Sequence, residues 1–492
     1  MKNDFGSIAD ENVTDGAPRL FWAVFAIAAL AGSFAAWHYA QAGLTLTHYD
    51  ARAHLVVARR VADSLTPGWR QFGAVWLPLP HLINFMPVQW DWAFRTGASA
   101  VAVSIGMLSW GLASLAQHLR RTTGSQAAAL AAPALILLNP NVLYLQGTPM
   151  TEPMLIGFAL VAMDRLDRYL RRTGGEAGAA LALTALVMTR YEGWLIAAGL
   201  LLVTAFARVR EGRRIAPLLW QLPFAAIVLF FVLSWASTGV WFVSSGFFVP
   251  EAELLHNMEN VFRHLREGIR DLTGPIVLWV AAAGAVVALF ASRRRAQALL
   301  PLALSCAIGL PLMAFYQGHP FRVRYLVPMI VAAAALAGWA IAALPKRAQA
   351  IAAVLLVGAA WWNRPPLDHG APMVLEAQRE SPMRVGREQV TAQLLHRGDQ
   401  TPILASMGSL GHYMQEASHA GFVLRDFLHE GNGDLWIEAI KQPRLSVRWI
   451  LMEEVAEGGD ALAQRARTDP TFLDGFERLG DGGGLVLYGR KN

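Results

Sequence analysis

Long apolar runs recur from residue 20 to residue 363, and they constrain the fold of this chain more than any other feature. A run of about 18–20 apolar residues is long enough to cross the hydrocarbon core of a bilayer as an α-helix. Only 16% of the 492 residues are charged, whereas a typical soluble protein carries about 25%. The sequence therefore predicts a polytopic α-helical membrane protein.

The basic residues between these runs indicate how the chain is oriented in the membrane. We predict about eleven spans, and every second loop between them carries a basic cluster, from Arg120-Arg121 to Lys346-Arg347. Basic loops stay on the cytoplasmic side, so residues 1–19 are expected to form a cytoplasmic tail and residues after 363 to lie outside the cell membrane. These clusters also account for the net charge of +6 without a nucleic-acid partner. The predicted spans are residues 20–42, 93–117, 126–139, 153–166, 177–189, 192–207, 215–239, 274–292, 297–315, 325–344 and 349–363.

Two regions are predicted to lie outside the membrane on the same face. The first is a polar loop, residues 43–92, whose apolar residues recur at helical spacing and predict a short amphipathic helix on the membrane surface, ended by Thr66-Pro67-Gly68. The second is residues 364–492, where β-type runs alternate with helix-like pieces, which predicts an extracytoplasmic α/β domain. The chain is thus divided into the tail, a transmembrane domain at residues 20–363 and this outer domain. The β-type runs are residues 401–406, 447–452 and 485–488.

Two carboxylates at the predicted outer surface are candidate catalytic residues. Asp50 lies just beyond the first span, where it can act as a general base toward an acceptor hydroxyl or simply cap the helix that follows. Glu152 lies at the outer mouth of the fourth span. An ionisable residue that enters a membrane helix is usually buried against protein and functional, although a carboxylate there can also stabilise the helix N-terminus.

Basic and aromatic residues at the same level are candidates for binding the substrate. Arg190 and Glu192 interrupt two apolar runs, and such a pair can either join two helices or bind a phosphate or sugar hydroxyls. Arg322 and Arg324, next to Tyr325, stand at an outer surface against the positive-inside preference. A bound phosphate would explain these arginines, and so would simple contact with lipid headgroups.

His54 and His81 in the outer loop are further candidates for substrate binding, with a structural hydrogen-bonding role as the alternative. Asp50 and Glu152 could coordinate a divalent cation through oxygen, but two carboxylates on separate loops are a weak signal for a metal site, and the cofactor stays unknown. Cys306 is the one cysteine, so no intrachain disulfide forms. The sequence contains no P-loop, no HExxH and no GxGxxG after a strand.

Short motifs spread over nearly the whole chain are similar to those of one known family. They are Tyr49-Asp50, Ala58-Arg59, residues 73–80, Glu152-Pro153, residues 324–328, residues 403–413 and Arg425-Asp426. Together with the predicted topology they resemble the GT-C membrane glycosyltransferases, and in particular the family 39-like branch of protein O-mannosyltransferases and aminoarabinose transferases. Two positions depart from the family pattern, because Ala51 stands where many relatives have a second acid and Trp76-Leu77 where some have a lysine.

The resemblance implies a GT-C fold and a cell-envelope enzyme that moves a sugar, with inversion, from a polyprenyl-phosphate donor to an acceptor protein, lipid or glycan. It implies Asp50 as the general base and Glu152 as a second acid that orients the reactants. Without the family's lysine, the phosphate-binding role moves to Arg324, with Arg322 and Arg190 as further candidates. A transporter or lipid flippase is the alternative, which is disfavoured because no repeat relates two halves of the chain.

Overall fold

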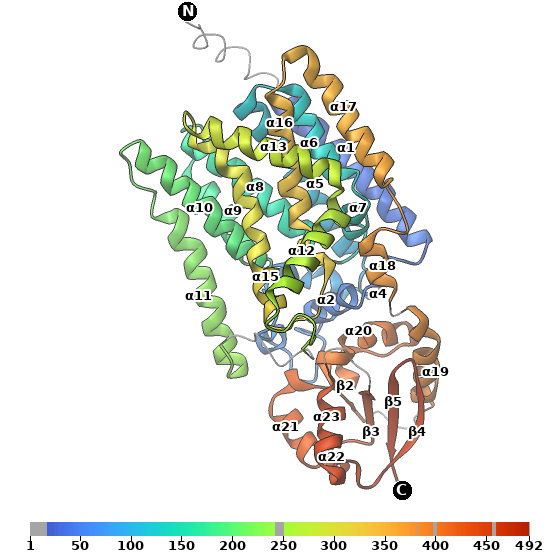
Figure 1. Ribbon diagram of the computed structural model, residues 1–492. Coiled ribbons are helices and arrows are strands. Elements are labelled where there is room, and N and C mark those ends of the chain that lie inside the picture. The colour runs from blue at the N-terminus through green and yellow to red at the C-terminus, as the bar shows by residue number, and fades with distance from the viewer. Residues whose placement is uncertain (1–16, 242–249, 380, 397–400, 455–458, 492) are drawn as a thin grey trace, which may run out of the picture.

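A bundle of long helices stands on a smaller α/β unit in a computed structural model of the protein (Figure 1). The structure describes residues 17–241, 250–379, 381–396, 401–454 and 459–491. Helix α1 begins at Ala17, at the end of the bundle farthest from the α/β unit, and β5, the last strand, lies within the α/β unit. Residues 1–16 of the predicted tail and residues 242–249 lie outside the described part of the chain.

Each of the eleven predicted spans is helical. Seven of the described helices are long and apolar enough to cross a membrane, or eight if α6 and α7, which are bent by 67° at their junction, form one span. The helices α8, α9 and α17 are shorter or more polar than that criterion requires, so the number of spans stays a prediction. The bundle consists of α1 (Ala17–Gln41), α5 (Ala98–Thr123), α6 (Gln126–Leu137), α7 (Pro140–Gln146), α8 (Glu152–Leu170), α9 (Glu176–Val187), α10 (Glu192–Arg210), α11 (Leu218–Thr238), α13 (Pro275–Ser292), a mixed helical segment ending in α15 (Gly309–Tyr316), the 3-10 turn Val323–Leu326, α16 (Pro328–Ala342) and α17 (Lys346–Asn363).

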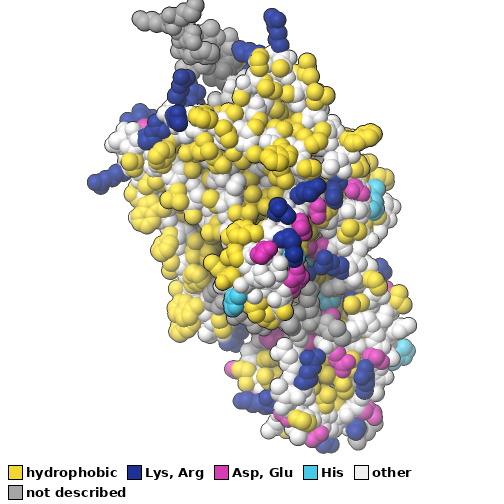
Figure 2. Space-filling view, in the orientation of Figure 1, with side chains coloured by type: hydrophobic (Ala, Val, Ile, Leu, Met, Phe, Trp, Pro, Cys, Tyr) yellow, Lys and Arg dark blue, Asp and Glu magenta, His cyan; other side chains and the backbone are white. Residues whose placement is uncertain are grey.

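The helices of the bundle differ in how much protein covers them. The segment 323–342 is 78% buried over its apolar window, whereas α1, α11 and α13 are only 22% buried. Figure 2 shows apolar side chains over most of the outside of the bundle, with lysine and arginine at the end away from the α/β unit and, mixed with acidic side chains, toward the α/β unit. A solvent-exposed apolar surface of this extent is typical of contact with lipid, which fits a polytopic membrane protein.

Helix α8 is fixed against α5 by two glycines. A Cβ atom at Gly157 would lie 2.4 Å from the carbonyl oxygen of Met107, and one at Gly111 would lie 2.8 Å from the Cα of Gly157. Only residues without a side chain permit so close an approach of two helix backbones. This contact sets the position of α8, and therefore of Glu152, its first residue.

The outer loop contains three short α-helices, and the first of them is more buried than predicted. The predicted amphipathic helix exists as α2 (Tyr49–Arg59), but nine of its residues are buried, so it is not a helix that lies on the membrane with one face in water. Its apolar residues Leu55 and Val56 belong to the hydrophobic core of the α/β unit, and its polar residues form ion pairs on two sides. The other two helices are α3 (Leu79–Phe85) and α4 (Asp91–Thr96).

The α/β unit contains a mixed five-stranded sheet in the order β2-β1-β3-β5-β4, with β1 parallel to both neighbours and β5 antiparallel to both of its own. The three predicted β-type runs are confirmed as β1, β3 and β5. Apolar residues of α19 and α20 pack on one face of the sheet and those of α21 and α23 on the other. The elements are α19 (Arg384–Leu395), β1 (Ile403–Ala405), α20 (Met407–Ala417), β2 (Phe427–Leu428), α21 (Asp434–Lys441), α22 (Pro443–Ser446), β3 (Trp449–Glu453), α23 (Ala461–Thr468), β4 (Phe476–Gly482) and β5 (Leu485–Arg490).

Two helices lie at the junction between the bundle and the α/β unit. Helix α12 (Met258–Thr273) forms the second half of the predicted loop between α11 and α13, and α18 (Pro372–Gln378) follows α17. Met373 and Val374 of α18 belong to the core of the bundle. The packing boundary therefore falls after α18 and not at residue 363, where the change in composition had been used to divide the chain.

Candidate active site

Asp50 lies in the first turn of α2 and forms a buried ion pair with Arg324. The backbone N–H of Asp50 donates to Nδ1 of His48 over 3.1 Å, so the side chain of His48 caps the helix. The carboxylate then points at the bundle, where its Oδ2 binds Nη1 of Arg324. Both side chains are only 8% exposed. The sequence placed these residues on one face of the membrane, and the fold brings them into contact.

Aromatic rings enclose the guanidinium of Arg324. Its Cζ lies 5.8 Å from the ring centre of Tyr49 and 5.2 Å from that of Tyr325. Such contacts orient a planar guanidinium and are stronger away from water. The 3-10 turn that carries Arg324 thus presents it toward Asp50 in a defined direction.

Arg190 forms a second buried group with two carboxylates. Its Nη1 lies 2.9 Å from Oε1 of Glu152, and its Nη2 lies 2.8 Å from Oε1 of Glu192. Its Cζ lies 6.0 Å from the ring of Tyr325, the ring that also contacts Arg324. Tyr325 therefore connects the two ion-paired groups, and both predicted acids belong to one continuous cluster.

His54 and His81 form a buried pair beside this cluster. Nδ1 of His54 and Nε2 of His81 are 3.0 Å apart, and Nδ1 of His81 donates to the carbonyl of Leu77 over 3.2 Å. Burial lowers the pKa of His81 to about 3, with help from the charge of Arg60. Burial, His81 and Arg190 hold the pKa of His54 well below its usual range. Both rings are therefore neutral at pH 7, and they line a small cavity of about 10 Å³ that also includes Thr151.

Glu376, which does not stand out in the sequence, also belongs to the cluster. Glu376 comes from α18, and its Oε2 accepts a hydrogen bond of 3.1 Å from the backbone N–H of Val323. Its Oε1 lies 3.5 Å from Nε2 of His48. Although burial raises the pKa of this carboxyl, His48, Arg324 and Arg322 lower it overall. No local pattern marks Glu376, because it lies beyond the last predicted span in a segment of ordinary composition.

The cluster as a whole is closely balanced in charge. Four carboxylates, those of Asp50, Glu152, Glu192 and Glu376, lie among three arginines, and Arg322 is one of them, buried near Glu376. An anionic ligand can enter such a site only by displacing a carboxylate from an arginine. Within the described ranges no three His, Cys, Asp or Glu side chains lie together in a way that could hold a metal ion.

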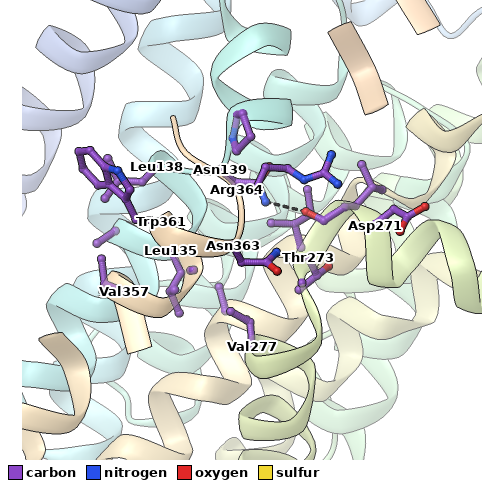
Figure 3. A pocket seen from close by; sticks show the side chains of 17 residues that line it. Leu135, Leu138, Asn139, Asp271, Thr273, Val277, Val357, Trp361, Asn363 and Arg364 are labelled. Carbon is purple, nitrogen blue, oxygen red and sulfur yellow. Dashed lines mark hydrogen bonds between the residues drawn. The ribbon is translucent and has the colours of Figure 1, made fainter. Parts of the chain in front are cut away.

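A separate cleft of about 500 Å³ opens between the bundle helices α6, α13, α16 and α17 (Figure 3). Apolar side chains such as Leu135 and Val277 line one part, and polar groups such as Asn139 and Arg364 line another. The amide of Asn139 donates to the carbonyl of Leu272 over 2.7 Å. None of the nine predicted site residues lines this cleft, so it lies outside the cluster around Asp50 and Arg324.

Comparison with solved structures identifies the fold. ArnT from Cupriavidus metallidurans bound to undecaprenyl phosphate is similar over 96% of this chain and 98% of its own, with a TM-score of 0.53 and 14% identity. The chain has the GT-C fold of membrane glycosyltransferases. The archaeal oligosaccharyltransferase AglB from Archaeoglobus fulgidus matches with a TM-score of 0.47 and 10% identity over 90% of this chain and 70% of that one. No protein-family model and no curated protein matches the sequence. The GT-C fold confirms the expected fold class.

Proposed function

We propose that the protein is an integral membrane glycosyltransferase that moves a sugar from a polyprenyl-phosphate donor to a hydroxyl of an acceptor protein, lipid or glycan. The buried Asp50–Arg324 pair carries this proposal, because it joins a carboxylate and a guanidinium where the outer loop meets the bundle of a GT-C fold. Inverting transfer needs a base for the acceptor and a positive charge for the departing phosphate. The carboxylate of Asp50 can serve as the base, and the guanidinium of Arg324 supplies the positive charge.

The donor phosphate competes with Asp50 for Arg324. When the phosphate binds Arg324, the carboxylate of Asp50 loses its partner and turns toward the acceptor hydroxyl. The acceptor oxygen attacks the anomeric carbon, the bond from that carbon to the phosphate oxygen breaks, and the hydroxyl proton moves to Asp50. The leaving polyprenyl phosphate keeps the bonding electrons, and Arg324 stabilises its added negative charge. Inversion follows because attack and departure occur on opposite faces of the sugar.

Glu152 acts as the second acid through Arg190. Because Arg190 is held by Glu152 on one side and Glu192 on the other, its guanidinium keeps a fixed position beside Tyr325. A sugar hydroxyl or a phosphate oxygen near Tyr325 can then bind Arg190 without a large movement. His81 uses both ring nitrogens within the protein, so it orients His54, whose Nε2 can accept a hydrogen bond from a sugar hydroxyl.

The orientation of the chain completes the proposal. The basic clusters at Arg120-Arg121 and Arg293–Arg295 end α5 and follow α13, and Lys346 begins α17. The positive-inside rule assigns these helix ends to the cytoplasm. The cluster around Asp50 and the α/β unit then face the outside of the cell membrane, where transfer takes place.

A direct assay tests this function. Purified protein in nanodiscs is incubated with a panel of polyprenyl-phosphate sugars and candidate acceptors, and mass spectrometry follows both the released polyprenyl phosphate and the modified acceptor. We expect transfer by the natural protein and a loss of at least about 10³-fold in kcat for Asp50→Asn, which is a general effect of removing a catalytic base. The control is Asp164→Asn, which removes a buried carboxylate at the other end of α8 and should keep its turnover per folded molecule.

Two results would overturn the assignment. If Asp50→Asn turned over at a near-normal rate, Asp50 would not be the base. If lipid-linked sugar crossed the bilayer of a vesicle without forming any product, the protein would be a flippase.

A further inference from the structure

A polar groove lies on the opposite side of α2 from Asp50, and it is separate from the cluster that we assign to the transfer reaction. Arg52 follows Asp50 by two residues, which is a rotation of about 200° around an α-helix. Accordingly Asp50 binds Arg324 of the bundle, whereas Arg52 binds Glu416 of α20. The groove has an open volume of about 1670 Å³ between the end of α1, the outer loop, α19 and α20.

Two arginines in the groove share one carboxylate. Oε2 of Glu416 accepts from Nη1 of Arg52 over 2.5 Å and from Nε of Arg387 over 3.1 Å. The side chain of Arg387 is only 2% exposed. Within the described part of the chain, its buried Nη1 has no hydrogen-bond partner. A buried guanidinium that shares its counter-charge with a second one is costly unless another acceptor arrives.

The rest of the groove is also more basic than acidic. Arg95 and Arg384 line it, and Glu388 is the other carboxylate among its lining residues. His419 also lines it but adds no charge at pH 7, because burial and Arg95 lower its pKa. Arg384 is 69% exposed and lies 2.9 Å from Glu388, so it can turn toward a ligand at little cost. The groove begins beside residues 42–47, directly after α1 ends at Gln41. If α1 is a span, this places the groove at the level of the lipid headgroups.

We propose that this groove binds the phosphate or carboxylate group of an anionic molecule at the membrane surface, as a second anion site distinct from Arg324. A guanidinium binds such a group with two parallel N–H donors, and Arg387 lines the groove with an Nη1 that has no hydrogen-bond partner within the described part of the chain. The anion comes either from a soluble molecule or from a lipid headgroup. Binding in the groove does not require that the protein transfer a sugar.

Protection of arginines from chemical modification tests this site. Full-length protein in phosphatidylcholine nanodiscs is treated with phenylglyoxal, with and without inorganic pyrophosphate, and the modified arginines are quantified by peptide mass spectrometry. We expect modification of Arg384 and Arg95 to slow at least about 3-fold with pyrophosphate, a modest occupancy effect. Arg478, which is 46% exposed on β4 and does not line the groove, is the internal control and should keep its rate. A parallel sample in nanodiscs with phosphatidylglycerol, without pyrophosphate, shows whether a lipid headgroup gives the same protection.

Variants of Arg387 make the test specific. Arg387→Gln removes the buried guanidinium, and Arg387→Lys keeps the charge but removes the paired donors, so both should abolish the protection of Arg384. If one variant fails to fold, which gel filtration detects, the other still decides the question. Protection in either medium that both folded variants lose supports the site. Absence of protection in both media, equal protection of Arg478, or protection that persists in the Arg387 variants would overturn it.

Discussion

The two ends of helix α8 both carry buried acids, but their ion pairs are built in different ways. At the far end, Asp164 and Asp167 bind arginines one turn later on the same helix, with Arg168 at 2.9 Å and Arg171 at 2.8 Å. At the near end, Glu152 binds Arg190, and the adjoining Asp50 binds Arg324, which is 274 residues away in the chain. Arg121 of α5 also pairs with both of these acids, so the far cluster joins two neighbouring helices, whereas the near cluster joins α2, α8 and the segments that carry Arg190 and Arg324.

This difference shows what each cluster can do. Arg168 and Arg171 are 30% and 24% exposed and pair within one helix, so these ion pairs form wherever α8 forms. Arg324 and Arg190 are only 8% and 12% exposed, and the chain must fold completely before they meet their acids. A ligand can separate partners that belong to different segments without unfolding a helix. The near cluster is therefore suited to binding and catalysis, and the far cluster to holding α8 in place.

The largest effect should come from removing Arg324 of the near cluster, and removal of Arg171 from the far cluster is the matched control. We expect Arg324→Gln to weaken binding of a polyprenyl phosphate by about 10- to 100-fold, the effect of losing a charge-assisted hydrogen bond. Arg171→Gln should leave that affinity unchanged. Titration of a labelled polyprenyl phosphate against the protein in nanodiscs measures both values. If Arg324→Gln bound the polyprenyl phosphate as tightly as the natural protein, Arg324 would not bind the donor phosphate.

The second prediction concerns competition within the near cluster. If the donor phosphate must displace Asp50 from Arg324, then Asp50→Asn should bind a polyprenyl phosphate about 10-fold more tightly while losing turnover. Asp164→Asn, the matched change at the far end, should have no effect on affinity. The same titration decides this. Weaker binding by Asp50→Asn would show that the carboxylate helps to hold the donor and does not compete with it.

The sequence predicts which residues enter the near cluster better than it predicts how they meet. Asp50 and Arg324 stand out because charged residues are rare in apolar surroundings, and topology places them on one side of the membrane. Their direct contact depends on how segments distant in the chain pack, which periodicity does not encode. For the same reason the pattern at Leu55 and Val56 predicts an amphipathic helix but cannot tell a lipid surface from the core of the α/β unit.

Glu376 shows a further limit on what the sequence can predict. The change in composition after residue 363 coincides with the end of α17 at Asn363, but α18 still packs into the bundle and brings a carboxylate to Val323. Strands β1, β3 and β5 were predictable because β-branched and aromatic residues concentrate in them, whereas β4 was not, because Phe476–Gly482 consists mostly of charged residues and glycine. The short β2 was not, since two residues carry too little pattern to recognise.

The third prediction uses the neutral histidines of the near cluster. The pKa of His81 is about 3 in the folded protein and about 6.5 when the chain is unfolded. Above pH 6.5 both states are neutral and stability does not depend on this group. Below pH 6.5 the unfolded chain binds a proton that the folded protein does not, so the free energy of unfolding falls by about 1.4 kcal/mol per pH unit. His81→Gln should reduce this slope, as measured by thermal unfolding between pH 7 and pH 5.

The same change at the exposed His396 is the control, and an unchanged slope in His81→Gln would contradict the buried neutral state.

The smallest effect is expected at the far end of α8. Arg171 pairs with Asp167 over 2.8 Å, but Arg121 also lies 3.3 Å from the same carboxylate. Removal of Arg171 therefore leaves Asp167 with a partner, and a partly exposed pair one turn apart contributes only about 0.3–0.5 kcal/mol. Arg171→Gln should lower the free energy of unfolding by about that amount, which denaturant titration in detergent can measure against the natural protein. A loss of several kcal/mol would mean that this arginine is needed for α8 to fold, and that the two ends of the helix are more alike than their geometry indicates.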